Sequence, residues 1–494
     1  RPPRATLFPY TTLFRSRFLN PKLSDLEDPF TLKGMREGIE RVTRALFQNE
    51  KITIYGDYDV DGITATALLY MVLNKLGAQV DFYLPNRLTE GYGLSKEGID
   101  ESKSNGVSLI ITVDTGITAV EEIKYANSIG IDVLVTDHHE PGDGLPAAYT
   151  IINPKQIACD YKSELSGVGV AFKFCQALYR ALNQDEAELW EHLDLVALGT
   201  SADIVPLVNE NRILTKFGIN QISRTTKPGL KSLTFVAGLM GKDISTGQVV
   251  FILAPRINAL GRLGDAGKAI RLLATRDERA AAEIARKLDS ENKRRKEIDE
   301  TTLEEALAQM DEVHDPEIDR AIVLAQDNWH QGVIGIVPSR PVERYHLPPV
   351  MTSIVNGEGK GSARSIPGFH LCEALKECEH LLIRYGGHKY AAGLSIAPDK
   401  VEPFRKLFVD VSNRILSEDD ITPKMHIDLE IELSDIDEKF MDSIESFAPF
   451  VPQNMRPVFL TRNFEVVGQP YIVGNDHEKT SLSQCDTQFH VIGV

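Results

Sequence analysis

Hydrophobic positions in the first part of the chain predict short buried strands that alternate with helices. Apolar runs of strand length are followed by stretches in which apolar residues return at helical spacing. The expected strands begin at Ile52 and at 80–84, 107–113, 131–135 and 149–152, and the expected helices span 32–47 and 65–76. This alternation indicates a parallel, doubly wound α/β sheet, whose ligands bind beyond the carboxyl ends of its strands.

The pattern changes after the expected sheet. Residues 165–273 are mostly helical in pattern, and 276–313 form a long, highly charged stretch with a sparse apolar stripe. Such a stretch is typical of a helix that connects domains rather than of a core helix. Its basic cluster, Lys293 to Lys296, is interpreted as a solvated face and only secondarily as a phosphate-facing patch.

A second α/β unit and a small β domain are expected beyond the charged stretch. The pattern predicts a strand at 321–325, a helix from Val333 and a strand near Val350. Residues 425–433 and 457–467 alternate between apolar and polar positions, which favours antiparallel strands.

Acidic and histidine residues stand directly after the expected strands. They are Asp57, Asp59 and Asp61 after the first strand, Asp114 after 107–113, and His138 and His139 after 131–135. Like charges so close together raise one another's pKa, and a divalent cation would neutralise them. A solvated acidic loop is the alternative, but its carboxylates would have no reason to recur at the ends of buried strands. Asp203 follows an apolar helix at 189–198 and fits either the same site or a helix-cap or turn role.

The ligand types indicate which ions the site would take. Carboxylates with one or two imidazoles suit Mn²⁺ or Mg²⁺, and the imidazole favours Mn²⁺. Two such ions at about 3.5–4 Å from each other can activate a water and stabilise charge on both the attacking and the leaving oxygen. The residue types therefore indicate a site for a divalent cation.

Two glycine-rich stretches offer contacts for a phosphate. The first, 359–365, alternates small residues with Ser362 and Arg364, which suits close backbone approach and a bidentate guanidinium contact. The second, 385–393, places His388 behind two glycines. Glycine-rich turns with polar residues are common, so a purely structural role stays open for each stretch.

Composition narrows the class of protein. Five scattered cysteines without a CxxC pair indicate neither a disulfide framework nor a zinc site, and a reducing, cytoplasmic location is expected. No apolar run is long enough to span a bilayer, so no membrane partner is expected. The net charge of −17 argues against non-specific coating of nucleic acid but allows a local basic groove.

Residues 1–16 show neither helical nor alternating periodicity and are expected to be non-native or disordered. The chain is expected to be a fragment at both ends.

Seven motifs together resemble those of a known superfamily. GDYDVDGITA, DTG, TDHHEPG and GTSADIVPL are similar to the four motifs of the DHH phosphoesterase superfamily, and APRINALGR, GSARS and YGGHKYAAG are similar to its single-stranded-DNA-specific exonuclease branch. The resemblance implies a parallel-sheet DHH domain joined by a long helix to a DHHA1 α/β domain, followed by a partial OB-like β domain. The expected divisions are 17–273, 274–313, 314–420 and 421–494.

The resemblance also assigns residues to roles. It implies metal ligands at Asp59, Asp61, Asp114, His138 and Asp203, and catalytic or auxiliary roles for Asp57, His139 and His388, the last facing the scissile phosphate. Substrate contacts are implied for Arg87, Arg262, Ser362 and Arg364, with Ser362 and Arg364 at the 5′-phosphate. One motif departs from the family: its usual Pro-Phe-Gly-x-Gly-Asn is Pro449-Phe-Val-Pro-Gln-Asn454 here.

The implied activity is removal of mononucleotides from single-stranded DNA in the 5′-to-3′ direction, in DNA repair and recombination. The resemblance implies two Mn²⁺ or Mg²⁺ ions as cofactors. Single-stranded DNA is the expected partner, together with a single-strand-binding protein and a helicase. A phosphodiesterase acting on short oligonucleotides or cyclic dinucleotides, or a soluble pyrophosphatase, is the nearest alternative, although neither needs so long a chain. A catalytically inactive nucleic-acid-binding or scaffold relative would be expected to lose ligands that this chain keeps.

Overall fold

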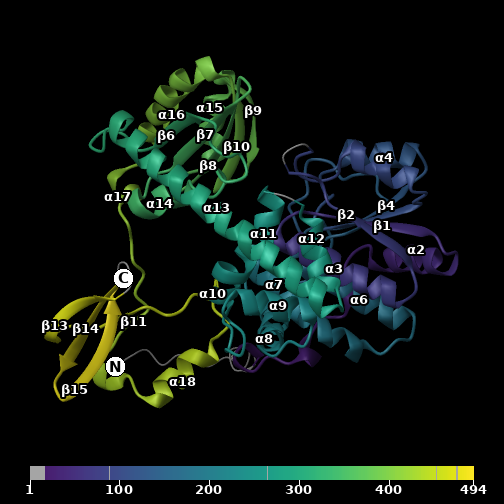
Figure 1. Cartoon of the computed structure of the whole chain (residues 1–494), viewed down its shortest axis with the longest axis horizontal. Helices are drawn as coiled ribbons and strands as arrows, with labels where there is room; N and C mark the ends of the chain where they lie inside the picture. The colour runs from purple at the N-terminus through teal and green to yellow at the C-terminus, as the bar shows by residue number, and fades with distance from the viewer. Residues whose placement is uncertain (1–16, 88–89, 264, 452, 474–476, 494) are drawn as a thin grey trace. The chain divides into compact units, whose positions relative to one another are not determined.

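The computed structural model describes residues 17–87, 90–263, 265–451, 453–473 and 477–493 (Figure 1). The expectation for residues 1–16 lies outside these ranges. The chain divides into two compact units: the first comprises Arg1–Tyr83, Gly93–Ala254 and Met425–Val494, and the second comprises Leu84–Tyr92 and Pro255–Lys424. Each unit is described by itself.

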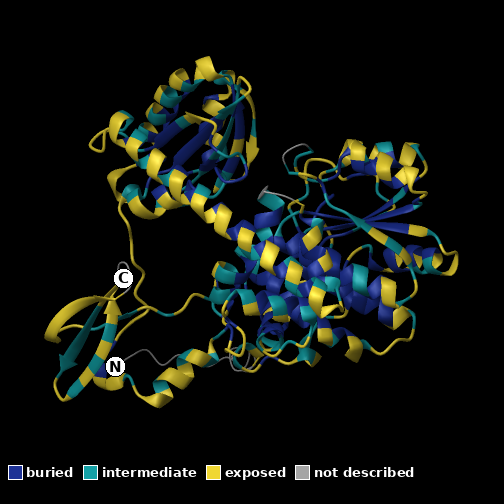
Figure 2. Cartoon of the chain, in the orientation of Figure 1, coloured by how far each residue is buried: buried dark blue, intermediate teal, exposed yellow. Residues whose placement is uncertain are grey.

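The first unit contains the expected parallel sheet. Its strand order is β2-β1-β3-β4-β5, and all of its pairs are parallel. The strands are β1 (Lys51–Gly56), β2 (Gln79–Tyr83), β3 (Leu109–Val113), β4 (Asp132–Thr136) and β5 (Thr150–Ile152). Every residue of β3 is buried, as expected for a central strand covered on both faces. The strands are largely dark blue in Figure 2 because helices shield them.

Helices cover both faces of this sheet. Residues of α4 (Lys96–Ser104) and α5 (Val120–Ser128) pack with Ile110 and Val133 on one face. On the other face lie α2 (Met35–Phe47), α3 (Val60–Lys75) and α6 (Gly167–Ala181), where Gly38 of α2 approaches Leu134. The sequence placed the start of α3 at residue 65, which was wrong. The helix begins at Val60 because Asp59 caps it, accepting from Gly62 N at 3.0 Å.

The expected helical stretch follows in the first unit. It comprises η3 (Glu186–His192), α7 (Leu193–Ala202), α8 (Asn209–Ser223), α9 (Pro228–Val236), α10 (Thr246–Gln248) and the π-helical segment η4 (Val249–Leu253). Nearly all of α7 is buried, because it packs against both α3 and α8. This burial explains the continuous apolar run that the sequence shows there.

The second unit holds a mixed five-stranded sheet of order β6-β7-β8-β10-β9. Its strands are β6 (Ile322–Asp327), β7 (Pro349–Val355), β8 (Glu358–Arg364), β9 (Leu382–Gly387) and β10 (Ala391–Ile396), of which only β6 and β7 pair in parallel. Its helices are α11 (Ala254–Leu263), which begins at the boundary of the first unit, α12 (Gly267–Ala274), α13 (Glu278–Val313), α14 (Ser339–Tyr345), α15 (Leu371–Glu377), α16 (Val401–Ile415) and α17 (Glu418–Ile421). Phe404 and Phe408 of α16 pack on one face of the sheet, and Met310 of α13 packs on the other.

One expectation for the second unit was wrong, and another held only in part. The helix expected from Val333 begins only at Ser339, and the preceding residues form tight turns whose apolar side chains are buried. The basic cluster on α13 is not wholly solvated, because Arg295 is only 8 % exposed, as is Asp299 one helical turn away. Lys293 and its other neighbours in the cluster are exposed as expected.

The C-terminal part of the first unit contains α18 (Glu438–Ser446) and a three-stranded antiparallel sheet of β13 (Glu465–Val473), β14 (His477–Gln484) and β15 (Thr487–Gly493). The strands expected at 425–433 and 457–467 are mostly absent from the described part of these ranges. Only β11 (Leu429–Glu430), β12 (Phe459–Leu460) and the start of β13 form there, and β11 pairs with β12 in parallel, so the antiparallel expectation was wrong for this pair.

Arg212 of α8 holds the chain after α18 against the rest of the unit. Its guanidinium donates to the carbonyls of Phe447 at 2.8 Å and Ala448 at 3.0 Å, and also to the carbonyl of Phe18 at 2.8 Å. The motif that departs from the family follows directly, and Asn454 closes it by donating to the carbonyls of Phe447 and Pro449. These two hydrogen bonds fix Asn454 against the residues at the start of the motif.

None of the helices in the described part of the chain combines the length and the hydrophobicity that crossing a bilayer requires.

Candidate metal centre and arginine cluster

The carboxyl ends of β1, β3 and β4 bring the expected acidic and histidine residues together. β1 ends at Gly56, just before Asp57 and Asp59; β3 ends at Val113, just before Asp114. Asp114 itself has a φ of +60°, a left-handed conformation that asparagine and aspartate adopt more readily than most residues.

Three overlapping groups of side chains lie close enough to hold a metal ion. They are Asp57 with Asp59 and Asp114, Asp61 with His138 and Asp203, and Asp114 with His138 and His139. Within each group the candidate ligand atoms all lie within 4.8 Å of one another. We call these seven residues the carboxylate–histidine cluster. Because the groups share Asp114 and His138, they can hold two neighbouring ions.

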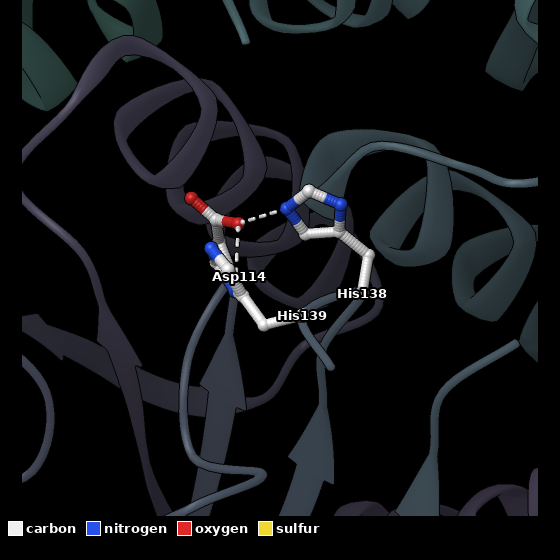
Figure 3. Close-up of side chains that lie close together, drawn as sticks. All are labelled: Asp114, His138 and His139. Atoms are coloured by element: carbon white, nitrogen blue, oxygen red, sulfur yellow. Dashed lines mark ion pairs between the residues drawn. The ribbon is translucent and has the colours of Figure 1, made fainter. Parts of the chain in front are cut away.

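His138 lies at the centre of the cluster. Its Nε2 atom is 3.0 Å from Asp114 Oδ1 and 3.6 Å from Asp203 Oδ2. Figure 3 shows the rings of His138 and His139 beside the carboxylate of Asp114, with His139 Nδ1 at 4.0 Å from Asp114 Oδ1. Within the described part of the chain, the buried atoms His138 Nε2 and Asp203 Oδ2 make no hydrogen bond. Ligand atoms that are buried and lack such partners fit a bound cation.

The pKa values of the cluster also favour a bound cation. Burial, and then the charges of Asp203 and Asp59, raise the pKa of Asp61 well above its usual range. Burial and the charge of Asp61 do the same to the pKa of Asp114, and burial with the charge of Asp59 raises the pKa of Asp203 to about 7. Burial lowers the pKa of His138 to about 3, so the histidine stays neutral and cannot compensate the carboxylates. A divalent cation would relieve this repulsion.

Backbone groups fix Asp61 in the cluster. Its two carboxylate oxygens accept from Gly167 N at 2.6 Å and from Val168 N at 2.9 Å, the first residues of α6. The helix N-terminus favours a negative charge at this point. Asp61 therefore holds its position without an ion.

Glycines that the sequence analysis did not single out make room for the carboxylates. A Cβ added at Gly167 would lie 2.5 Å from Asp114 Oδ1, and one at Gly199 would lie 2.7 Å from Asp61 Oδ1. At Gly62 a Cβ would lie 2.6 Å from the carbonyl oxygen of Asp57. All three distances are too short for a side chain. Gly199 was detectable in principle, because it interrupts an otherwise apolar helix.

Asp137 also has a role that the sequence did not reveal. Its Oδ1 atom accepts from His139 Nδ1 at 2.7 Å and from the His138 backbone N–H at 2.7 Å, and its Oδ2 atom accepts from Ile117 N at 2.9 Å. Although burial opposes it, the hydrogen bond and charge of His139 lower the pKa of Asp137. Asp137 thus orients His139 and keeps a proton on Nδ1. Its place as the first residue of the Asp-His-His triplet was the available signal.

The second unit gathers the expected substrate-contacting residues around Gly335. A Cβ added at Gly335 would lie 3.6 Å from Arg87 Nη2, 3.9 Å from Arg262 Nη1 and 4.0 Å from Ser362 Oγ. Arg364 Nη2 donates to the carbonyl of Gly335 at 2.6 Å. We call Arg87, Arg262, Ser362 and Arg364 the arginine cluster. Burial, and then the charge of Arg87, lower the pKa of Arg364, and this crowding of positive groups suits an anion.

The first glycine-rich stretch contributes differently from the expectation. It forms β8, and its glycines serve the sheet core: a Cβ at Gly359 would lie 2.8 Å from Ile396, and one at Gly361 would lie 2.7 Å from Leu394. Because side chains alternate along a strand, Ser362 and Arg364 point to the opposite face. The interpretation of these glycines as a close backbone approach to phosphate was therefore wrong, whereas Ser362 and Arg364 do lie in one cluster.

His388 lies at the turn between β9 and β10. Its backbone N–H donates to the carbonyl of Ala391 at 2.8 Å, and its side chain is exposed. It is not among the residues that surround Gly335. Its role at the scissile phosphate stays a prediction.

Three segments of the chain match models of known protein families. Residues 51–200 match the DHH family, N-terminal domain, residues 319–413 match the DHHA1 domain, and residues 427–493 match the RecJ OB domain. The chain is 41 % identical over 481 residues to the single-stranded-DNA-specific exonuclease RecJ of Bacillus subtilis (strain 168), covering 96 % of this chain and 60 % of the relative. It is 41 % identical over 397 residues to RecJ of Escherichia coli (strain K12), covering 76 % of this chain and 69 % of that protein.

A solved structure is similar over almost the whole chain. The crystal structure of RecJ from Thermus thermophilus in complex with Mn²⁺ matches with a TM-score of 0.84 and 33 % identity, covering 98 % of this chain and 69 % of that one. The combination of an α/β sheet, a DHHA1 domain and an OB domain that the sequence predicted is thereby confirmed.

Proposed function

The chain belongs to the RecJ family of single-stranded-DNA-specific exonucleases, and on this basis we propose that it removes mononucleotides from the 5′ end of single-stranded DNA with two divalent ions, Mn²⁺ or Mg²⁺. The convergence of seven carboxylate and histidine residues beside the carboxyl ends of three parallel strands, including Asp203 from the end of α7, is the observation that carries the proposal. The chain spans 60 % of the length of the Bacillus subtilis relative. That this chain carries the activity of the full-length relative is therefore a proposal.

The carboxylate–histidine cluster would hold the ions. Asp59, Asp61, Asp114, His138 and Asp203 are the proposed ligands, with Asp57 and His139 beside them. When bound, the ions supply activation of water and stabilisation of negative charge on phosphate oxygens. The protein supplies fixed geometry, since backbone groups hold Asp61 and Asp137 orients His139. Such preorganisation lowers the cost of ordering the site when substrate arrives.

The arginine cluster would bind the 5′-terminal phosphate. Arg364, Arg87 and Arg262 offer charge-assisted donors, and Ser362 adds a hydroxyl. His388 is proposed to face the scissile phosphate.

The proposed domains are a catalytic DHH domain at 17–273, a connector at 274–313, a DHHA1 domain at 314–420 and an OB-like domain at 421–494.

Partners and location follow from the substrate. Single-stranded DNA arises when duplex is unwound, so a helicase and a single-strand-binding protein are the proposed partners, in the cytoplasm and in repair or recombination. Binding of a single strand through basic groups should weaken as salt rises.

One assay tests the proposed function. Initial rates with Mn²⁺ are compared on a long 5′-labelled single strand, a blunt duplex and a dinucleotide, with EDTA as the metal-free control. We expect release of mononucleotides from the single strand, little action on the duplex and no activity in EDTA. Equal rates on duplex would refute strand specificity. A strong preference for the dinucleotide would favour the alternative phosphodiesterase acting on short substrates.

A further inference from the structure

The segment between β6 and α14 lies against the arginine cluster and is packed into the hydrophobic core. Val333, Ile334 and Val337 are buried in one apolar cluster with Trp329 and Met351, and tight turns link them, such as Ile336 N to the carbonyl of Val333 at 2.8 Å. A segment fixed by several buried side chains holds its backbone at a defined place. The glycines between these side chains are therefore held at fixed positions too.

Two of these glycines anchor guanidinium groups through their carbonyls. Gly332 accepts from Arg262 Nη1 at 3.1 Å, and Gly335 accepts from Arg364 Nη2 at 2.6 Å. These contacts use carbonyl groups that a helix would otherwise pair with its own N–H groups. They explain why the helix expected from Val333 does not form, and they orient two arginines of the cluster.

Gly332 and Gly335 differ in what a side chain would meet. A Cβ at Gly332 would lie 2.5 Å from the carbonyl oxygen of Arg262, a distance that forces the backbone to shift. At Gly335 the distances to Arg87 Nη2, Arg262 Nη1 and Ser362 Oγ run from 3.6 to 4.0 Å, which is ordinary van der Waals contact. Gly332 is thus required by the fold, whereas the protein alone could accommodate a methyl group at Gly335.

We propose that Gly335 is a specificity-determining residue for the 5′-phosphate: the absence of a side chain there leaves space for a phosphate oxygen among Arg87, Arg262 and Ser362. The inference rests on the proposed function. An oxygen that accepts from these donors must come to about 2.7–2.9 Å from each of them. A methyl group at Gly335 faces the same three atoms, so it would compete with the oxygen for the space between them. The lowered pKa of Arg364, due to burial and Arg87, agrees with an anion at this point.

The test compares Gly335→Ala with the unchanged chain in a binding assay without hydrolysis. Fluorescence anisotropy in EDTA is measured with an oligothymidylate labelled at its 3′ end, carrying either a 5′-phosphate or a 5′-hydroxyl. We expect Gly335→Ala to weaken binding of the phosphorylated strand about tenfold, the effect of losing one or two charge-assisted contacts. Binding of the hydroxyl strand should change by less than about twofold, because that end makes no such contacts.

Two further variants separate folding from recognition. Gly144→Ala is the matched control, since a Cβ there meets nothing within 4 Å, and it should leave both affinities unchanged. Gly332→Ala should lower the melting temperature, whereas Gly335→Ala should leave it close to that of the unchanged chain.

The outcomes distinguish this inference from the proposed function. If the unchanged chain digests single-stranded DNA and prefers a 5′-phosphate, but Gly335→Ala keeps that preference, the role of Gly335 is refuted and the function stands. Equal loss of affinity for both strands would also refute it, because the effect would not concern the phosphate. If the unchanged chain fails to digest single-stranded DNA at all, the proposed function itself fails.

Discussion

Two groups of buried charges in the first unit differ in what neutralises them. In one, Lys173 of α6 contacts Glu210 Oε1 at 3.2 Å and donates to the carbonyl of Glu27 at 2.6 Å, and the hydroxyl of Tyr161 donates to Glu210. Both Lys173 and Glu210 are almost fully buried. This group is complete, because every charge has a partner of opposite sign or a hydrogen bond from the protein.

The carboxylate–histidine cluster instead brings five carboxylates together with two histidines, so negative charge is in excess there. Burial raises the pKa of carboxylates in both groups, that of Glu210 to about 8, but at Asp61 and Asp114 the charges of several neighbouring aspartates raise the pKa further. His138 stays neutral beside them, because burial lowers its pKa to about 3. The contrast shows that buried charge alone does not mark a site. The cluster differs because it holds an excess of negative charge that the surrounding protein does not balance. Such an excess implies that a cation binds there.

The largest expected effect tests the ligand role directly. Asp114→Asn should lower turnover on single-stranded DNA in Mn²⁺ about 10³-fold, because it removes a charge that holds the ions while preserving the shape and the left-handed backbone. The melting temperature of the metal-free protein should stay the same or rise, since repulsion is relieved. Asp59→Ala should likewise lower turnover. Near-normal turnover in either variant would contradict the metal assignment.

The balanced group should show the opposite behaviour. Lys173→Met leaves Glu210 buried without its cation and should lower the free energy of unfolding by about 3 kcal/mol. Activity per folded molecule should be retained, because the group lies outside the carboxylate–histidine cluster. The exposed neighbour Lys162→Met provides the control and should have little effect on stability. Urea unfolding combined with rates at low temperature would check both, and loss of activity without loss of stability would overturn the distinction.

The arginine cluster extends the comparison to an excess of positive charge. Arg364→Ala should reduce the preference for a 5′-phosphate over a 5′-hydroxyl by about 1.5–3 kcal/mol, because an uncharged hydroxyl cannot form a charge-assisted hydrogen bond with the guanidinium. Competition between phosphorylated and unphosphorylated strands measures the preference. A variant that misfolds but keeps its preference in the soluble fraction would instead assign Arg364 a structural role.

The smallest expected effect concerns pH. Burial and neighbouring charge raise the pKa of Asp203 to about 7 in the folded, metal-free protein, above its unfolded value of 3.8. The folded state then binds more protons than the unfolded state between these values, so stability is present at low pH and falls as pH rises through this window. The fall should reach at least about 1.4 kcal/mol, the equivalent of one pKa unit. Thermal melting from pH 4 to pH 7 in EDTA and in Mn²⁺ would test this, and a fall of equal size in Mn²⁺ would contradict it.

Much of the carboxylate–histidine cluster was predictable from local pattern. An apolar run such as 109–113 forms a buried parallel strand, and the carboxyl ends of parallel strands meet at one edge, so the sequence alone places Asp114 and His138 together. The motifs then assigned Asp203, which pattern alone could equally have placed in a helix cap. The roles of Asp137 and Gly199 were missed, because they depend on contacts rather than on periodicity.

The sequence by itself determined the alternation of strands and helices, the strand ends that carry charge and the resemblance to a family. Only the tertiary structure decided which charges are balanced and which are not. Lys173 and Glu210 lie on different helices, and the residues around Gly335 come from a loop, a helix end and a strand. Hydrophobic periodicity shows which side chains of a segment face solvent and which face the core. The partner of a buried charge is instead set by packing between segments that are distant in the chain, and no local pattern encodes that packing.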